Sequence, residues 1–162
     1  MGGRTFPSVA AAGGELAAVL GSRRALADVC LRGRLSGRER EHIMVAVSRV
    51  NACSGCTFVH ERWALRAGAT DDELRALQRG ELGRLDGRSR ACVAYAMARA
   101  EAQFDDASRA AAPSALTARD IAAVDAVARA MTLANLTVNT AEAAWARIRQ
   151  LAHRRTVTPP TG

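Results

Sequence analysis

The sequence predicts an all-α fold, and three observations support this. Apolar residues make up 49% of the 162 residues but aromatic residues only 4%, so the core must be built from Ala, Leu and Val. Abundant alanine favours helix. Apolar residues recur at helical spacing, and no segment alternates convincingly with a period of two. A chain of this length is expected to form one domain that buries its own core.

The first half of the chain contains four predicted helices. One is expected over residues 14–31, and a second over residues 36–52 with Ser36 as its possible N-cap. A third starts near Cys53 and runs to Arg66. A capping box of Thr70 and Glu73 opens the fourth.

The second half contains a predicted helix over residues 87–103 and a loop over residues 105–116. A capping box of Thr117 and Asp120 then opens a helical stretch, either one long helix or two that meet near residues 135–139. The result is a bundle of about six helices. Residues 1–152 are expected to form the domain and residues 153–162 a flexible C-terminal tail.

Charge and targeting signals argue against a nucleic-acid-binding, secreted or membrane protein. The net charge is +7, and all 23 basic residues are Arg. They are scattered among several predicted helices with acids between them, so we expect no nucleic-acid partner. No signal peptide and no run of eighteen or so apolar residues is found, so we expect a cytoplasmic protein without a membrane partner. In a reducing compartment, cysteines are more often catalytic or metal-binding than structural.

The stretch VNACSGCTFVHER, residues 50–62, concentrates the reactive side chains. On a helix, Cys53, Cys56 and His60 lie within about 60° of arc and face one way. A helix N-terminus stabilises a thiolate, and a histidine one turn along can take the thiol proton. A Cys-x-x-Cys pair can also close into a disulfide when one sulfur is oxidised. The pattern therefore favours thiol redox chemistry.

Other interpretations of this stretch stay open. Two cysteines, a histidine and a glutamate are plausible zinc ligands. A structural pair, or a redox-sensing helical interaction protein without turnover, is also compatible with the spacing. Covalent haem attachment is excluded because Thr57, not histidine, follows Cys56.

A carboxylate could complete the site from the preceding helix. Glu41 lies twelve residues before Cys53 and could return towards His60 if the two helices fold back on each other. A carboxylate beside a histidine orients the imidazole ring. Glu39 and Glu61 are competitors for the same position.

The spacing Glu41-x11-Cys53-Ser-Gly-Cys56-x3-His60, followed by ALRAGATDDEL, resembles the alkyl hydroperoxidase D-like branch of the carboxymuconolactone decarboxylase family. The resemblance is strongest over residues 36–74. It implies an all-helical bundle that forms a homo-oligomer, a trimer or a hexamer. It also implies thiol-dependent reduction of a peroxide, with a dithiol reductant that is lipoamide-like or a partner protein, and with no cofactor and no bound metal.

The same resemblance assigns roles to four residues. Cys56 would be the peroxidatic thiol, Cys53 the resolving thiol, and His60 with Glu41 the proton relay. Cys53 is the alternative attacker, because it is closer to the helix start and is expected to be more exposed. The chain departs from the best-studied branch at Gly55, where another histidine precedes the second cysteine. Family members without the cysteine pair are decarboxylases, and the pair argues against that chemistry here.

The remaining special residues receive ordinary interpretations. Cys30 and Cys92 lie in apolar helical patterns and are expected to pack in the core. His42 should point about 100° away from Glu41 and lie on the surface. Val59 and Trp63 are expected to line the pocket beside His60 and to pack in the core.

Overall fold

The computed structural model of the protein describes residues 2–157, with side chains described as far as residue 153. This part of the chain folds into eight α-helices and one 3-10 turn and has no β-strand, which confirms the all-α prediction. The helices are α1 (Val9–Gly21), α2 (Arg23–Arg32), α3 (Gly37–Val50), α4 (Ser54–Arg66), α5 (Asp71–Arg79), α6 (Gly87–Glu101), α7 (Asp106–Ala110) and α8 (Ala118–Val157), with η1 at Leu82–Arg84.

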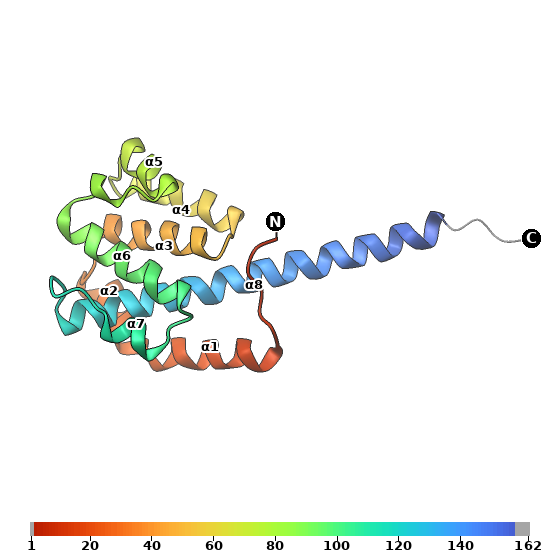
Figure 1. The fold of residues 1–162 in the computed structure, drawn as a ribbon, viewed down its shortest axis with the longest axis horizontal. Helices are drawn as coiled ribbons and strands as arrows, with labels where there is room; N and C mark the ends of the chain where they lie inside the picture. Colours follow the sequence, from red (N-terminus) through yellow and green to blue (C-terminus); the bar gives the residue numbers. More distant parts are fainter. Residues whose placement is uncertain (1, 158–162) are drawn as a thin grey trace, which may run out of the picture.

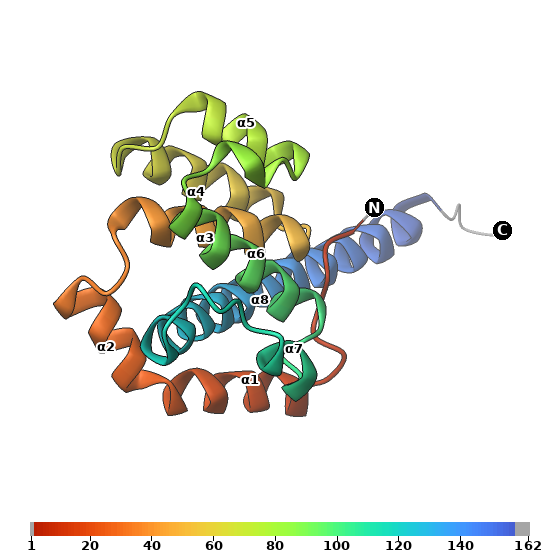
Figure 2. The same ribbon diagram turned by 60° about the vertical axis from the view of Figure 1, so that its left-hand side comes forward.

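Helix α8 is the axis of the molecule. Its N-terminal half is packed against α1, α2, α3 and α6, while α4 packs on α3 and α5 lies beyond them (Figures 1 and 2). The C-terminal half of α8 extends away from this body as a single straight helix (Figure 1). Helix α3 is thus the layer between the α8 core and the α4 helix that carries the cysteine pair.

The core is built from small aliphatic side chains, as the composition predicts. Along the buried half of α8, Ala123, Ala126 and Ala128 are 1% exposed or less, and Val124 and Val127 are at most 2% exposed. Short side chains let helices approach closely, so the chain packs its interior with few aromatic rings.

Two parts of the helix prediction are wrong. The predicted helix over residues 14–31 is broken at Ser22, which caps the end of α1 through Ala18 and Val19 and also begins α2. The predicted loop over residues 105–116 contains the short helix α7, whose N-cap Asp105 accepts a hydrogen bond from the Ser108 amide. The α7 error comes from side-chain capping by Asp105, whereas at Ser22 the backbone amide ends α1 and no side chain caps α2. An apolar pattern reveals neither feature.

The capping signals were more reliable. Ser36 caps α3 and forms a full box with Glu39, and Thr70 does the same for α5 with Glu73. At the start of α8, Asp120 accepts from the Thr117 amide, and its own amide donates to the Thr117 hydroxyl. Each box satisfies amide groups that the first turn of a helix leaves unpaired.

Helix α8 is one continuous helix, which decides between the two possibilities that the sequence left open. It runs through the first five residues of the expected tail, and residues 158–162 lie outside the described residues. By length and composition, Ala118–His153 could cross a membrane, although 56% of its most apolar window is buried inside the protein. Its Asp125 pairs with Arg99 of α6 and Asp120 with Arg88 of α6, as expected for the core helix of a bundle.

Candidate functional site: a cysteine pair with a histidine and a carboxylate

The cysteine pair lies at the turn between α3 and α4. Helix α4 begins at Ser54, next to the predicted start near Cys53. Cys53 is its N-cap residue, and the Cys53 amide donates to the carbonyl of Ser48. Cys53 and Cys56 form a disulfide with their Cα atoms 5.4 Å apart. Cys53 is 2% exposed, whereas Cys56 is partly accessible. The expectation that Cys53 is the more exposed cysteine is therefore wrong.

The structure brings Glu41 to His60. Nδ1 of His60 lies 2.8 Å from Oε2 of Glu41, across the contact between α3 and α4. Glu41 is 4% exposed, and its other oxygen is 3.4 Å from Nε of Arg40. A carboxylate on Nδ1 fixes the proton of the ring there and leaves Nε2 as the free acceptor.

The two competing carboxylates are engaged elsewhere. Glu39 serves the capping box of α3 and binds Arg88 of α6 at 2.7 Å. Glu61 accepts a hydrogen bond from Gln78 of α5 at 2.8 Å. Of the three candidate glutamates, Glu41 alone contacts His60 in the described part of the chain.

Buried amide side chains hold the turn that carries Cys53. Nδ2 of Asn51 donates to Oγ1 of Thr132 and to Oδ1 of Asn135, each at 3.2 Å. Nδ2 of Asn135 then donates to Oγ of Ser48 at 3.2 Å. The α8 helix is thereby fastened to the last turn of α3, directly before the cysteine pair.

The backbone carbonyl of Asn51 accepts two further hydrogen bonds that hold this turn. It accepts from the Arg4 amide at 3.0 Å and from Nδ2 of Asn139 at 2.9 Å. A Cβ at Gly3 would overlap the Asn139 side chain, so only glycine lets the N-terminal segment pass this close. Ala52, which follows Asn51, has a φ of +52°. This is the left-handed region, which a non-glycine residue adopts only when its surroundings impose it.

Sequence reasoning missed these amides as parts of the site. Asn135 and Asn139 were interpreted as a possible break between two helices, but both are buried anchors on a continuous helix. The available signal was polar amides placed four residues apart inside an otherwise apolar helix. Such groups must find partners when they are buried.

Several side-chain expectations need correction. His42 is 0% exposed rather than on the surface, because α3 is covered on almost every side. Cys30 is exposed rather than packed in the core, while Cys92 is buried as expected and burial raises the pKa of its thiol to about 11. Trp63 contacts the His60 ring edge-on at 5.2 Å, but Trp63 and Val59 are exposed and do not pack in the core.

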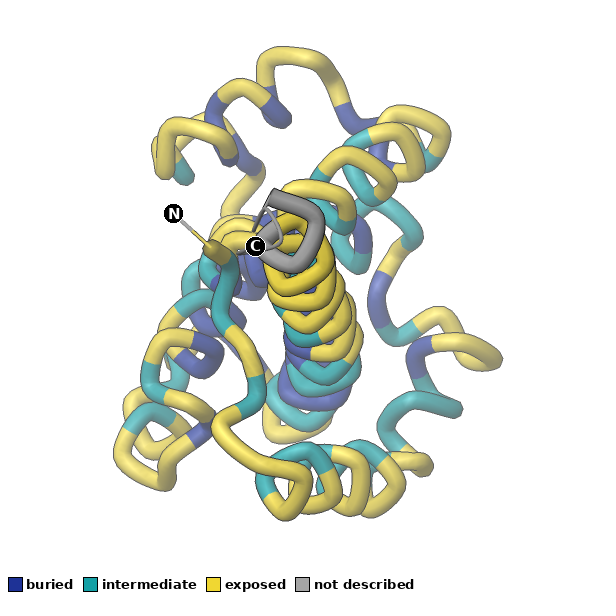
Figure 3. Tube along the Cα trace, turned by 90° about the vertical axis from the view of Figure 1, so that its right-hand side faces the viewer, coloured by how far each residue is buried: buried dark blue, intermediate teal, exposed yellow. Residues whose placement is uncertain are grey.

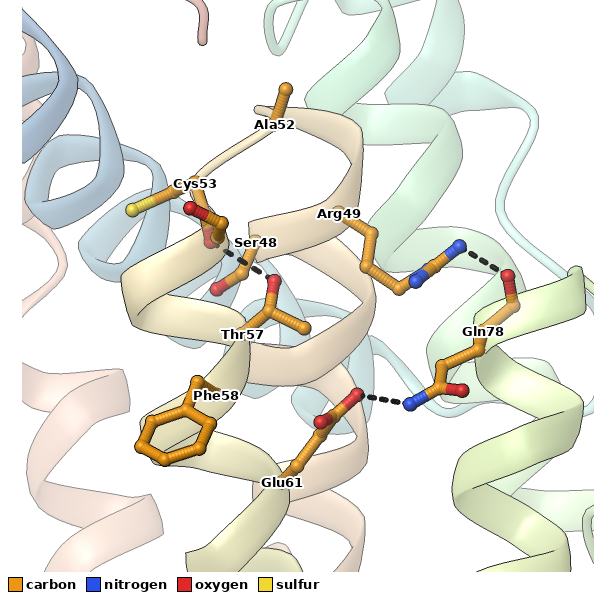
Figure 4. A pocket seen from close by; sticks show the side chains of 9 residues that line it. Ser48, Arg49, Ala52, Cys53, Thr57, Phe58, Glu61 and Gln78 are labelled. Carbon is orange, nitrogen blue, oxygen red and sulfur yellow. Dashed lines mark hydrogen bonds between the residues drawn. The ribbon is translucent and has the colours of Figure 1, made fainter.

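A cavity of about 460 Å³ lies between α3, α4 and α5, and its lining includes Arg49, Cys53, Glu61 and Gln78. Figure 4 shows the Cys53 sulfur turned away from Arg49 and Gln78, which close the opposite wall through their own hydrogen bonds. The cavity lining does not include Cys56, His60 or Glu41. The cavity therefore lies on the side of the cysteine turn that faces α5, and it is not the space in which His60 acts.

The zinc interpretation finds no arrangement to support it. Across the described residues, no group of three or more His, Cys, Asp and Glu side chains is placed to hold a metal ion.

Comparison with models of protein families shows to which family the chain belongs. The sequence model of the carboxymuconolactone decarboxylase family matches residues 16–98, slightly more than half of the chain. The chain belongs to the carboxymuconolactone decarboxylase family. Comparison with curated proteins and with solved structures gives no match.

The part of the chain that matches the carboxymuconolactone decarboxylase family contains all four reactive residues of the candidate site. It extends from within α1 to within α6 and includes Glu41, Cys53, Cys56 and His60. The amides Asn135 and Asn139, which fasten the turn from α8, lie outside it. In this member of the family, the reactive groups therefore belong to the matched region, and part of their support comes from α8.

Proposed function

We propose that this protein is a thiol-dependent hydroperoxide reductase of the alkyl hydroperoxidase D-like branch of its family. The observation that carries the proposal is the 2.8 Å contact between the buried carboxylate of Glu41 and the ring of His60, one helical turn from a cysteine that is paired as a disulfide. A carboxylate–histidine pair beside a redox-active thiol is the arrangement that thiol activation requires.

Cys56 is the attacking residue in this proposal. It is the more accessible of the two cysteines, and it lies four residues before His60 on one face of α4. With Nδ1 held by Glu41, Nε2 of His60 accepts the thiol proton, directly or through a water. The Cys56 thiolate then attacks the terminal peroxide oxygen, the O–O bond breaks, and the departing alkoxide takes a proton to leave as an alcohol or water. Cys56 becomes a sulfenic acid.

Cys53 completes the oxidation. Its thiol attacks the sulfenic sulfur of Cys56, the S–O bond breaks, water leaves, and the disulfide forms. An external dithiol then reduces this disulfide by exchange and is itself oxidised to a disulfide. A lipoamide-like molecule or a dithiol on a partner protein fits this step.

Substitution of each cysteine tests the proposal with the purified protein, an alkyl hydroperoxide and a dithiol. Wild type should consume peroxide through many turnovers. Cys56→Ser should abolish this activity, and Cys53→Ser should permit one oxidation that mass spectrometry detects as a sulfenic acid or mixed disulfide. Sulfenic acid formation by Cys56→Ser at the wild-type rate would reverse the two roles.

The same assay separates an enzyme from a redox-sensing protein without turnover. A sensor would oxidise once per chain and would not consume further peroxide when the dithiol is present. The exposed thiol of Cys30 needs a control. A Cys30→Ser background removes its oxidation without touching the paired cysteines.

A further inference from the structure

The C-terminal half of α8 exposes large apolar side chains that no described residue covers. Two residues hold α8 to the body at this point: Asn139, bound to the Asn51 carbonyl, and Thr140, which accepts from the Phe6 amide at 3.0 Å. Beyond them, Trp145, Ile148 and Leu151 are 59%, 56% and 61% exposed. Figure 3 shows that this part of α8, which we call the arm (residues 141–153), is mostly exposed.

Most large exposed apolar residues of the arm, together with Val138 just before it, lie on one stripe, and Leu151 lies at the edge of that stripe. Val138, Ala141, Trp145, Ile148 and Ala152 are all exposed and are separated alternately by three and four residues. This is the spacing of the seam of a coiled coil, in which two helices bury the same stripe against each other.

Charges beside the stripe indicate what it meets. Glu142 and Arg149 lie along the same edge, seven residues apart, and neither forms an ion pair with another described residue of its own chain. In an antiparallel pair of arms centred between Trp145 and Ile148, each Trp145 lies beside Ile148 of the second copy. The same register brings Glu142 of each arm close to Arg149 of the other, twice by symmetry.

We infer that the arm is a self-association surface and that its occupant is the arm of a second copy of this chain, packed antiparallel. The arm is already helical and anchored, so pairing does not have to form the helix first, which lowers the cost of association. Trp145 and Ile148 supply the central buried contacts. This inference does not depend on the proposed function, and the contact joins two chains whether or not another interface builds a larger oligomer.

Matched substitutions on two faces of the arm test the surface. Ile148→Glu places a charge in the stripe, and Gln150→Glu places the same charge on the opposite exposed face of the arm. In sedimentation velocity at tens of micromolar, wild type and Gln150→Glu should have the same mass. Ile148→Glu should have half that mass, or a dissociation constant at least about tenfold higher. A monomeric wild type, or an unchanged mass for Ile148→Glu, overturns the inference.

Charge exchange tests the antiparallel register. Glu142→Arg and Arg149→Glu should each weaken association, because each creates two like-charge pairs, and the double exchange should restore it. Failure of the double exchange to restore association overturns this register. Binding to vesicles of phosphatidylcholine and phosphatidylserine tests whether the arm binds a membrane surface instead. A monomeric wild type that binds these vesicles, with binding lost in Ile148→Glu, would assign the arm to a membrane.

Discussion

The ring of His60 meets the carboxylate of Glu41 at 2.8 Å, although the two residues are 19 positions apart and belong to different helices. The contact exists because α3 and α4 fold back on each other around the turn at Asn51 and Ala52. It converts two common side chains into one acid–base unit beside the cysteine pair.

Removing the charge of Glu41 should slow peroxide reduction without unfolding the protein. We expect Glu41→Gln to lower kcat/KM by about 10- to 100-fold, because His60 loses the carboxylate that orients its ring. Glu61→Gln is the matched control, since Glu61 lies on α4 but binds Gln78, and its activity should stay at the wild-type level. Equal losses in both variants would contradict the relay.

The amide network should control how readily the disulfide forms. Asn51→Ala removes the donor to Thr132 and Asn135 and should cost about 1–3 kcal/mol of unfolding free energy. Because the turn then holds Cys53 less firmly, the thiol–disulfide equilibrium with glutathione should also shift towards the dithiol.

The control for Asn51→Ala is a buried hydrogen bond far from the turn. Tyr95→Phe breaks the bond between Tyr95 and Asp125 and should lower stability without moving the glutathione equilibrium. If both variants shift the equilibrium alike, the network has only a general structural role.

His42 should make stability depend on pH. Burial, with a smaller contribution from Arg38, lowers the pKa of this imidazole despite the facing Glu73, Asp86 and Glu39. Neither ring nitrogen has a hydrogen-bond partner among the described residues, and Nε2 is 4.0 Å from Glu73. The unfolded chain then takes up a proton more readily than the folded one, so stability should be full above about pH 6.5 and fall below it.

His42→Leu tests this dependence. The variant should not be less stable than wild type at pH 7, and its melting temperature should decline less between pH 7 and pH 5. His153→Leu, which removes an exposed histidine, provides the comparison. A decline identical to wild type in His42→Leu would show that another group is responsible.

Asp86 should contribute to stability in acid. Hydrogen bonds from the backbone and side chain of Ser89 lower the pKa of this carboxyl to about 2, with a further contribution from Arg38. Its contribution is therefore present above pH 4 and is lost as the pH falls towards 2. Asp86→Asn keeps a side chain that can cap α6 but does not titrate. Thermal unfolding should show a flatter profile for this variant between pH 4 and pH 2, and a profile as steep as wild type would contradict the assignment.

Local patterns were sufficient wherever a feature depends on neighbours in the chain. The capping box at Thr70 and the start of α4 beside Cys53 follow from a few consecutive residues. The common face of Cys56 and His60 follows from helical geometry alone, because four residues make about one turn. The break at Ser22 escaped prediction because the apolar spacing continues across it.

The sequence by itself determined the helical class, most helix starts and the family to which the cysteine pair pointed. Only the tertiary structure selected Glu41 over Glu39 and Glu61, buried His42, and showed that Asn135, at a possible helix break, is an anchor inside one helix. The physical reason is the range of the interactions. Helix formation is governed by residues within one or two turns, whereas burial and contacts between helices depend on which faces the whole chain brings together.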